Sequence, residues 1–124
     1  MKKYLIYSLL FTGLAFFSCK KNKLGGNAEI KGVVKHHIKV IANATVYIKF
    51  NAKEFPGNDI SVYDDKVIAD ANGNYSIKCY KGDYYLYAVG TDQDVPPPYI
   101  VKGGVPIKIR SSEKVEANLA VTED

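Results

Sequence analysis

The stretch DANGNYSIKCYKGDYYLYA, residues 70–88, is the most informative part of this 124-residue chain for its fold. Its first five residues are a strong turn signal. Apolar and polar side chains then alternate, with Tyr75 and Ile77 on one face. A second turn at residues 81–83 leads into another alternating run that begins at Tyr84. A period of two between turn signals predicts β-strands and argues against helices.

The same pattern continues in both directions along the chain. Further alternating or short apolar runs cover residues 30–34, 44–50, 66–69, 107–110 and 115–121. About seven short strands at this spacing predict an all-β fold, a single antiparallel Greek-key β-sandwich. Residues 28–124 are numerous enough to form one small domain with its own core, and no helical period runs through them.

The N-terminus has the composition of an export signal. Within residues 1–18, Lys2 and Lys3 stand directly after Met1. The apolar run that follows them is shorter than the roughly 20 residues that a helix needs to cross a bilayer. Because a cysteine follows the small residue Ser18, the stretch resembles the lipobox of bacterial lipoproteins. That resemblance implies that the Cys19 thiol is acylated and that the peptide bond before it is cleaved, so that the protein binds the membrane through this lipid.

The next segment, KKNKLGGN at residues 20–27, is predicted to be a flexible tether. Residues 19–27 would then be the lipidated cysteine with its tether, and residues 28–124 the folded domain. Surface-exposed lipoproteins of Bacteroidota often carry an acidic export signal after the cysteine, which residues 20–23 lack. The comparison implies the periplasmic face of the outer membrane and leaves surface exposure open.

The charge balance differs between the N-terminal segment and the domain. The chain has 17 Lys and Arg and 13 Asp and Glu, a formal net charge of +4. The excess of basic residues lies in the signal and the tether, so from residue 28 onward the two signs nearly balance. A nucleic-acid-binding domain needs a basic face of its own, and nucleic acid is therefore not an expected partner.

Several short motifs, taken together, point to a known family. They are IKGVV at 30–34, ATVYI at 44–48, Asp70-x-x-Gly73-x-Tyr75, GDYYL at 82–86 and the closing run at 115–121. In order and spacing they resemble the carboxypeptidase regulatory-like domain, a transthyretin-like (Ig-like) Greek-key sandwich. In peptidases with such a domain, catalysis belongs to a separate domain. The loops at 53–65 and 91–104 depart from the family pattern.

The motif residues have structural explanations. Gly73 and Gly82 are expected at turn positions that need a positive φ, and the Asp70 carboxylate is expected to bond the backbone of its own turn. Tyr75 and Tyr84 are predicted to point into the core by alternation. Cys79 is interpreted as a small buried hydrophobe.

Catalytic and metal-binding patterns are weak. His36 and His37 are adjacent, so in a strand they would point to opposite faces, and the sequence suggests no third ligand. The motif at 70–81 lacks the glycine and glutamate of a calcium loop. The sequence therefore predicts neither a metal site nor a cofactor, and favours a protein that is not an enzyme.

Tyrosines provide the candidate binding surface. If Tyr84 faces the core, Tyr85 and Tyr87 face outward, and a hairpin with the preceding strand would place Tyr80 beside them. Such a face suits contact with a protein or stacking on sugar rings, although ordinary cross-strand tyrosine pairing is the slightly favoured explanation. The two further candidates are Tyr47 and, after the stiff Pro96–Pro98 segment, Tyr99.

Three hypotheses of function follow. The favoured one is a non-catalytic, membrane-anchored module that acts as an interaction or structural accessory of an envelope protein. The second is a carbohydrate-binding module that uses the tyrosine face. The third is a cation-dependent adhesin whose two acidic loops converge; their carboxylates are those of Asp59, Asp64, Asp65, Asp92 and Asp94.

Overall fold

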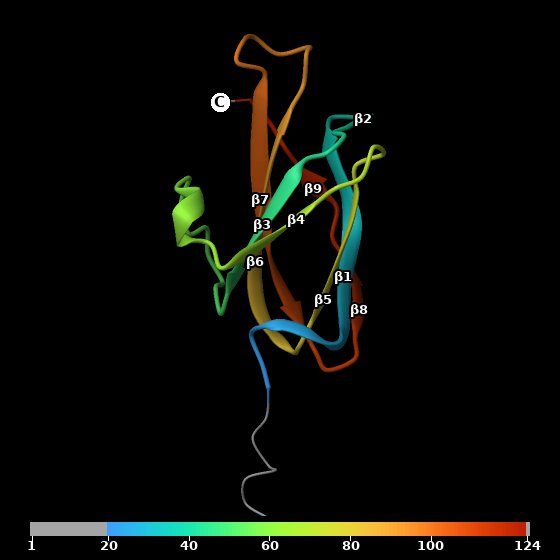
Figure 1. The fold of residues 1–124 in the computed structure, drawn as a ribbon, viewed down its shortest axis with the longest axis vertical. Helices are drawn as coiled ribbons and strands as arrows, with labels where there is room; N and C mark the ends of the chain where they lie inside the picture. Colours follow the sequence, from blue (N-terminus) through green and yellow to red (C-terminus); the bar gives the residue numbers. More distant parts are fainter. Residues whose placement is uncertain (1–19, 124) are drawn as a thin grey trace, which may run out of the picture.

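The computed structural model describes residues 20–123, and it confirms the all-β sandwich (Figure 1). The predictions for residues 1–18 and Cys19 lie outside the described residues. The strands are β1 (Leu24–His36), β2 (Lys39–Val40), β3 (Thr45–Phe50), β4 (Asp65–Ile68), β5 (Asn74–Cys79), β6 (Gly82–Thr91), β7 (Ile100–Ile109), β8 (Lys114–Glu116) and β9 (Leu119–Ala120). Between β3 and β4 lies a short 3-10 turn, η2 (Ile60–Val62). Residues 20–123 contain no helix long and apolar enough to span a membrane.

The strands form two sheets. One has the order β4-β3-β6-β7 and is antiparallel throughout. The other is built around the long strand β1, which pairs antiparallel with β2 and β5. Strands β8 and β9 add parallel pairs to β1, so the second sheet is mixed.

One predicted pairing is wrong: β5 and β6 do not form a hairpin. β5 pairs with β1, whereas β6 pairs with β3 and β7 in the other sheet. The turn at residues 80–82 therefore crosses from one sheet to the other. The physical reason is that both strands have an apolar face, and those faces pack against each other across the sandwich.

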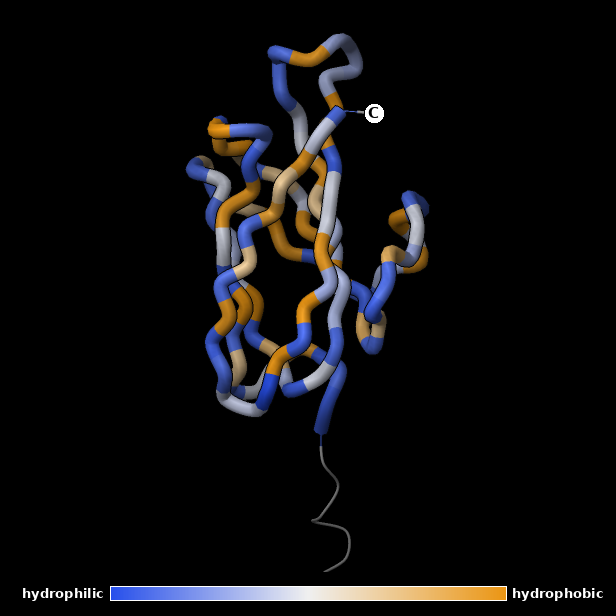
Figure 2. The backbone as a smooth tube through the Cα atoms, turned by 180° about the vertical axis from the view of Figure 1, so that it is seen from behind, coloured by the Kyte–Doolittle hydropathy of each residue, from blue (hydrophilic) through white to orange (hydrophobic). Residues whose placement is uncertain are grey.

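Alternation along the strands places the core. Hydrophobic and hydrophilic residues follow one another along most of the chain (Figure 2). Tyr75 and Tyr84 point inward as predicted, with 4% and 0% of their surface exposed. Cys79 is fully buried among apolar side chains, and this burial raises the pKa of its thiol. Since every buried residue of the core cluster lies between Ala28 and Val121, residues 20–123 contain the whole described core.

The turns use side-chain and glycine chemistry. Asp70 Oδ1 accepts hydrogen bonds from the backbone N–H groups of Asn72 (2.8 Å) and Asn74 (2.9 Å). Gly73 has φ +77°, and Gly82 has φ +152° with Asn22 packed where a Cβ would stand. Both conformations favour glycine.

The predicted start of the domain at residue 28 needs correction. β1 begins at Leu24, and the backbone of residues 22–23 is hydrogen-bonded to the β5–β6 turn. Gly25 and Gly26, with φ +96° and +80°, form an irregularity in the strand and lie against the Tyr80 ring. These glycines therefore permit close packing in a folded strand, where the sequence suggested a flexible tether.

Candidate functional site

The predicted tyrosine face lies on the outer side of the β4-β3-β6-β7 sheet, but it is not exposed. Tyr85 and Tyr87 have only 8% and 3% of their surface accessible. The 51–64 segment, which contains η2, folds beside this sheet (Figure 1). Phe55 lies 5.7 Å from Tyr85 and 5.4 Å from Tyr87 between ring centroids, and Tyr63 stacks on Tyr87 at 5.5 Å. The expectation of an open tyrosine surface is therefore wrong.

The physical reason is the length of the insertion. Its apolar and aromatic side chains cover the tyrosines because burial of both sets removes apolar surface from water. Asn58 Oδ1 also accepts a hydrogen bond of 3.1 Å from the Tyr87 hydroxyl. Burial raises the pKa of Tyr63 to about 12.

Of the remaining candidate tyrosines, Tyr47 joins the covered face as the cross-strand partner of Tyr87, whereas Tyr80 and Tyr99 lie elsewhere. Tyr47 is half-buried beside Tyr63, with 5.8 Å between their ring centroids. Tyr80 lies where the N-terminal segment enters the domain, below the Lys20 and Lys23 ammonium groups. Tyr99 is half-buried and packs against the core. A continuous stacking platform for sugar rings is therefore not assembled from these five side chains.

The two acidic loops do not converge either. Asp59 accepts hydrogen bonds from Ser61, and Asp64 accepts one from the Phe50 N–H. Asp92 and Asp94 instead bind Lys39. Within residues 20–123, no three His, Cys, Asp or Glu side chains are grouped to hold a metal ion.

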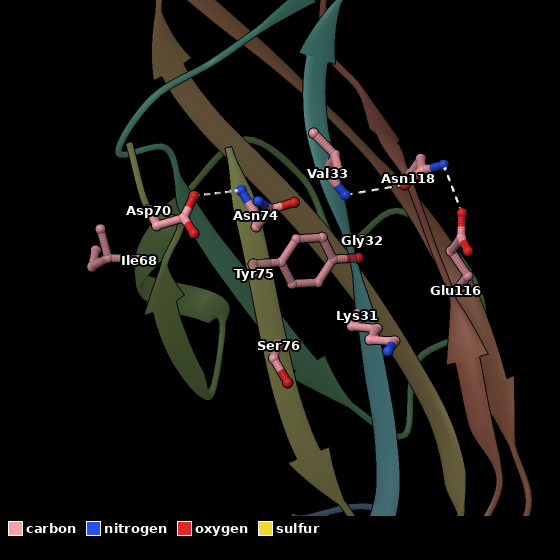
Figure 3. Close-up of a pocket in the computed structure, with 10 residues that line it drawn as sticks. All are labelled: Lys31, Gly32, Val33, Ile68, Asp70, Asn74, Tyr75, Ser76, Glu116 and Asn118. Carbon is pink, nitrogen blue, oxygen red and sulfur yellow. Dashed lines mark hydrogen bonds between the residues drawn. The ribbon is translucent and has the colours of Figure 1, made fainter. Parts of the chain in front are cut away.

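A groove of about 580 Å³ crosses the sheet built on β1 (Figure 3). Asn118 spans part of it, accepting a hydrogen bond from the Val33 N–H at 3.0 Å and donating one to Glu116 Oε1 at 3.3 Å. The Tyr75 ring lies beside Gly32, and its hydroxyl donates to the Ala117 carbonyl. These bonds join β1, β5 and the β8–β9 connection, so the residues of the groove have a structural role.

The end of the sandwich away from the first described residue contains a buried charge network. His36, the last residue of β1, and Asp92, just after β6, are 8% and 3% exposed. Asp92 Oδ2 lies 2.8 Å from His36 Nδ1, and Asp92 Oδ1 lies 2.7 Å from Lys39 Nζ. Lys39 also reaches Asp94 at 3.1 Å. The network joins the β1–β2 hairpin to the loop that contains Pro96–Pro98.

The network shifts the pKa values of Asp92 and Lys39. The Lys39 hydrogen bond, then the Asp94 backbone N–H and His36, hold the pKa of Asp92 far below its usual range. The hydrogen bonds to Asp92 and Asp94 raise the pKa of Lys39. The burial of His36 was not predicted from the sequence. Alternation through Ile30, Gly32 and Val34 would have placed it on the inward face.

Beside this network is an open hollow of about 400 Å³, which we call the distal hollow. It is lined by His36, His37, Ile38, Lys39, Asp92, Asp94, Val95 and Glu123. Ile38 stands at the tip of the β1–β2 hairpin with 95% of its surface exposed. The preceding residue, His37, has φ +57°, which makes the tight turn. The hollow thus combines a projecting apolar side chain with charged walls.

Replacing Asp92 by asparagine should destabilise the domain at neutral pH, because His36 and Lys39 lose their anionic partner. The folded-state pKa of Asp92 is depressed. The contribution of Asp92 to the stability of the domain is therefore complete above the ordinary aspartate pKa. It is lost as the pH falls below that pKa and through the lower pKa of Asp92 in the folded state. Thermal melting of both proteins between pH 7 and pH 2 should show a gap in Tm of several degrees that narrows as the pH falls below about 4. Asp65→Asn is the control, and an equal gap at all pH values would contradict the mechanism.

Comparison with known proteins adds a distant structural likeness. No family model matches this sequence, and no curated protein matches it. The fold is similar to the crystal structure of a DUF3823 family protein from Parabacteroides merdae, with a TM-score of 0.48 and 16% sequence identity. The likeness covers 79% of this chain and 47% of that chain, so this chain spans about half the length of that protein.

Proposed function

We propose that this protein is a non-catalytic envelope lipoprotein, anchored through Cys19, whose distal hollow binds a protein partner. The resemblance of residues 1–19 to a lipoprotein signal supports the anchor, and the absence of an acidic export signal favours the periplasmic face of the outer membrane. The resemblance to a carboxypeptidase regulatory-like domain supports an accessory role.

The observation that carries the proposal is the exposure of Ile38. An isoleucine that is 95% exposed gains about 1.5–3 kcal/mol when a partner buries it. Ile38 lies between His36 and Lys39, which both bind Asp92. The hairpin tip is thus held in place before binding, which lowers the conformational entropy lost on association.

The placement of the hollow agrees with this role. The described chain starts at one end of the sandwich, and the β1–β2 hairpin and the loop at 92–99 lie at the other (Figure 1). A domain anchored at its first end therefore presents the hairpin away from the membrane. The charged walls, from Lys39 to Glu123, would align the partner and select against unsuitable ones.

The Ile38→Asp variant should lose the partner. We expect crosslinked native membranes to give one dominant partner with the wild-type protein and at least tenfold less with Ile38→Asp, because the buried apolar contact is lost. Ile68→Asp is the matched control, since Ile68 is also exposed (59%) but lies on β4. Cys19→Ala tests the anchor separately by its release from the membrane fraction.

The outcomes are distinct. Equal recovery with Ile38→Asp and the wild type would reject the hollow as the contact. Equal loss with Ile38→Asp and Ile68→Asp would point to a general effect of added charge. Retention of Cys19→Ala in the membrane, with the same extraction behaviour as the wild type, would reject the lipid anchor.

A further inference from the structure

Basic side chains gather at the end of the sandwich where the described chain begins. An open hollow of about 590 Å³ there is lined by Lys21, Lys81, Lys108 and Arg110, with Asp83 as its acidic member. These residues come from the N-terminal segment, the β5–β6 turn and the end of β7. The tertiary structure therefore brings together cations that are far apart in the sequence.

Two further lysines extend this surface. Lys20 Nζ and Lys23 Nζ lie 5.8 Å and 5.5 Å from the centroid of the Tyr80 ring. All six basic residues are exposed, and none forms a salt bridge to a carboxylate of residues 20–123. Glu113 lies beside Arg110, accepting a hydrogen bond from its backbone N–H. We call the six residues the basic end.

We propose that the basic end docks on the anionic headgroups of the bilayer. Charge complementarity is the first argument, because each Lys or Arg near an anionic bilayer surface adds attraction. The position of the chain is the second, since Lys20 follows Cys19 directly and its ammonium group lies over Tyr80 at this end. A lipid on Cys19 would hold these cations within a few ångströms of the headgroups.

The consequence is a fixed orientation. Residues 22–23 are hydrogen-bonded to the β5–β6 turn, so little free chain separates Cys19 from the folded domain. With the basic end on the bilayer, the distal hollow points away from the membrane. The orientation rests on the proposed lipid anchor, whereas the affinity of the basic end for headgroups does not.

The test therefore uses residues 20–124, which contain the whole described core and lack the anchor. We expect this domain to co-sediment with vesicles of two-thirds phosphatidylcholine and one-third phosphatidylglycerol, and to stay in solution with pure phosphatidylcholine. The triple variant Lys81→Glu, Lys108→Glu, Arg110→Glu should bind on the order of a hundredfold more weakly. Molar salt should abolish wild-type binding.

The matched control reverses three exposed lysines elsewhere: Lys31→Glu, Lys35→Glu, Lys66→Glu. It carries the same net charge as the first variant, and we expect it to keep at least a third of wild-type affinity. Circular dichroism and thermal melting verify that both variants fold. Equal loss in the two variants, or wild-type binding to neutral vesicles alone, would overturn the proposal. Tighter binding to a DNA oligomer than to the anionic vesicles would also overturn it.

Discussion

Substituting alanine for Gly32 should destabilise the domain by about 3 kcal/mol and lower its Tm by more than roughly 10 °C. A Cβ at this position would lie 2.5 Å from the Ala117 carbonyl carbon and still closer to its oxygen. The backbone here cannot yield easily, because the Ala117 N–H donates to the Lys31 carbonyl at 2.8 Å and the Ala117 carbonyl accepts from the Tyr75 hydroxyl. The clash therefore falls where β1 meets the β8–β9 connection.

Gly57→Ala is the control for this prediction. Gly57 has φ +117°, but no atom lies within 4 Å of its Cβ position. Alanine there should cost only about 1–2 kcal/mol of backbone strain. Urea unfolding followed by circular dichroism compares the two variants. If Gly32→Ala is no less stable than Gly57→Ala, the packing of β1 against Ala117 is not the constraint described.

The second large effect is expected at Tyr84, which joins the N-terminal segment to the core. Its side chain is fully buried, and its hydroxyl lies 2.7 Å from the Tyr80 carbonyl and 3.0 Å from that of Lys23. Tyr84→Ala should cost about 4 kcal/mol through the cavity that it creates. Tyr84→Phe keeps the ring and should cost about 1–2 kcal/mol.

Hydrogen exchange separates these two contributions. In Tyr84→Phe, the Tyr80 amide, which donates to the Lys23 carbonyl at 2.9 Å, should exchange faster than in the wild type. Tyr47→Phe is the control, since the Tyr47 hydroxyl makes no hydrogen bond within residues 20–123 and its loss should cost under about 0.5 kcal/mol. Unchanged protection of Tyr80 would show that Tyr84 does not hold the segment.

The core was predictable because its signal is local. In β5 and β6, alternation alone identifies Tyr75, Ile77, Tyr84 and Leu86 as inward-facing. The turn at 70–74 is equally local, since Asp70 bonds the backbone only two and four residues further on. Such patterns need no knowledge of any distant partner.

The candidate sites were less predictable because their parts are distant in the sequence. His36 and Asp92 are 56 residues apart, and neither residue alone indicates the other. The cover over Tyr87 comes from an insertion whose side chains show no strand pattern. The hairpin expected between β5 and β6 was wrong for a related reason: alternation reports which side is apolar, not which strand lies alongside.

The all-β class, the inward faces of the strands and the turn chemistry were predictable from the amino-acid pattern, because period and turn propensity act over a few residues. Three other features became visible only in the folded chain: Gly25 and Gly26 lie in a strand, Tyr85 and Tyr87 are covered, and Lys21, Lys81, Lys108 and Arg110 meet at one end. Those outcomes depend on which segments pack against each other. That choice is made by the burial of apolar surface and the pairing of charges across the whole chain.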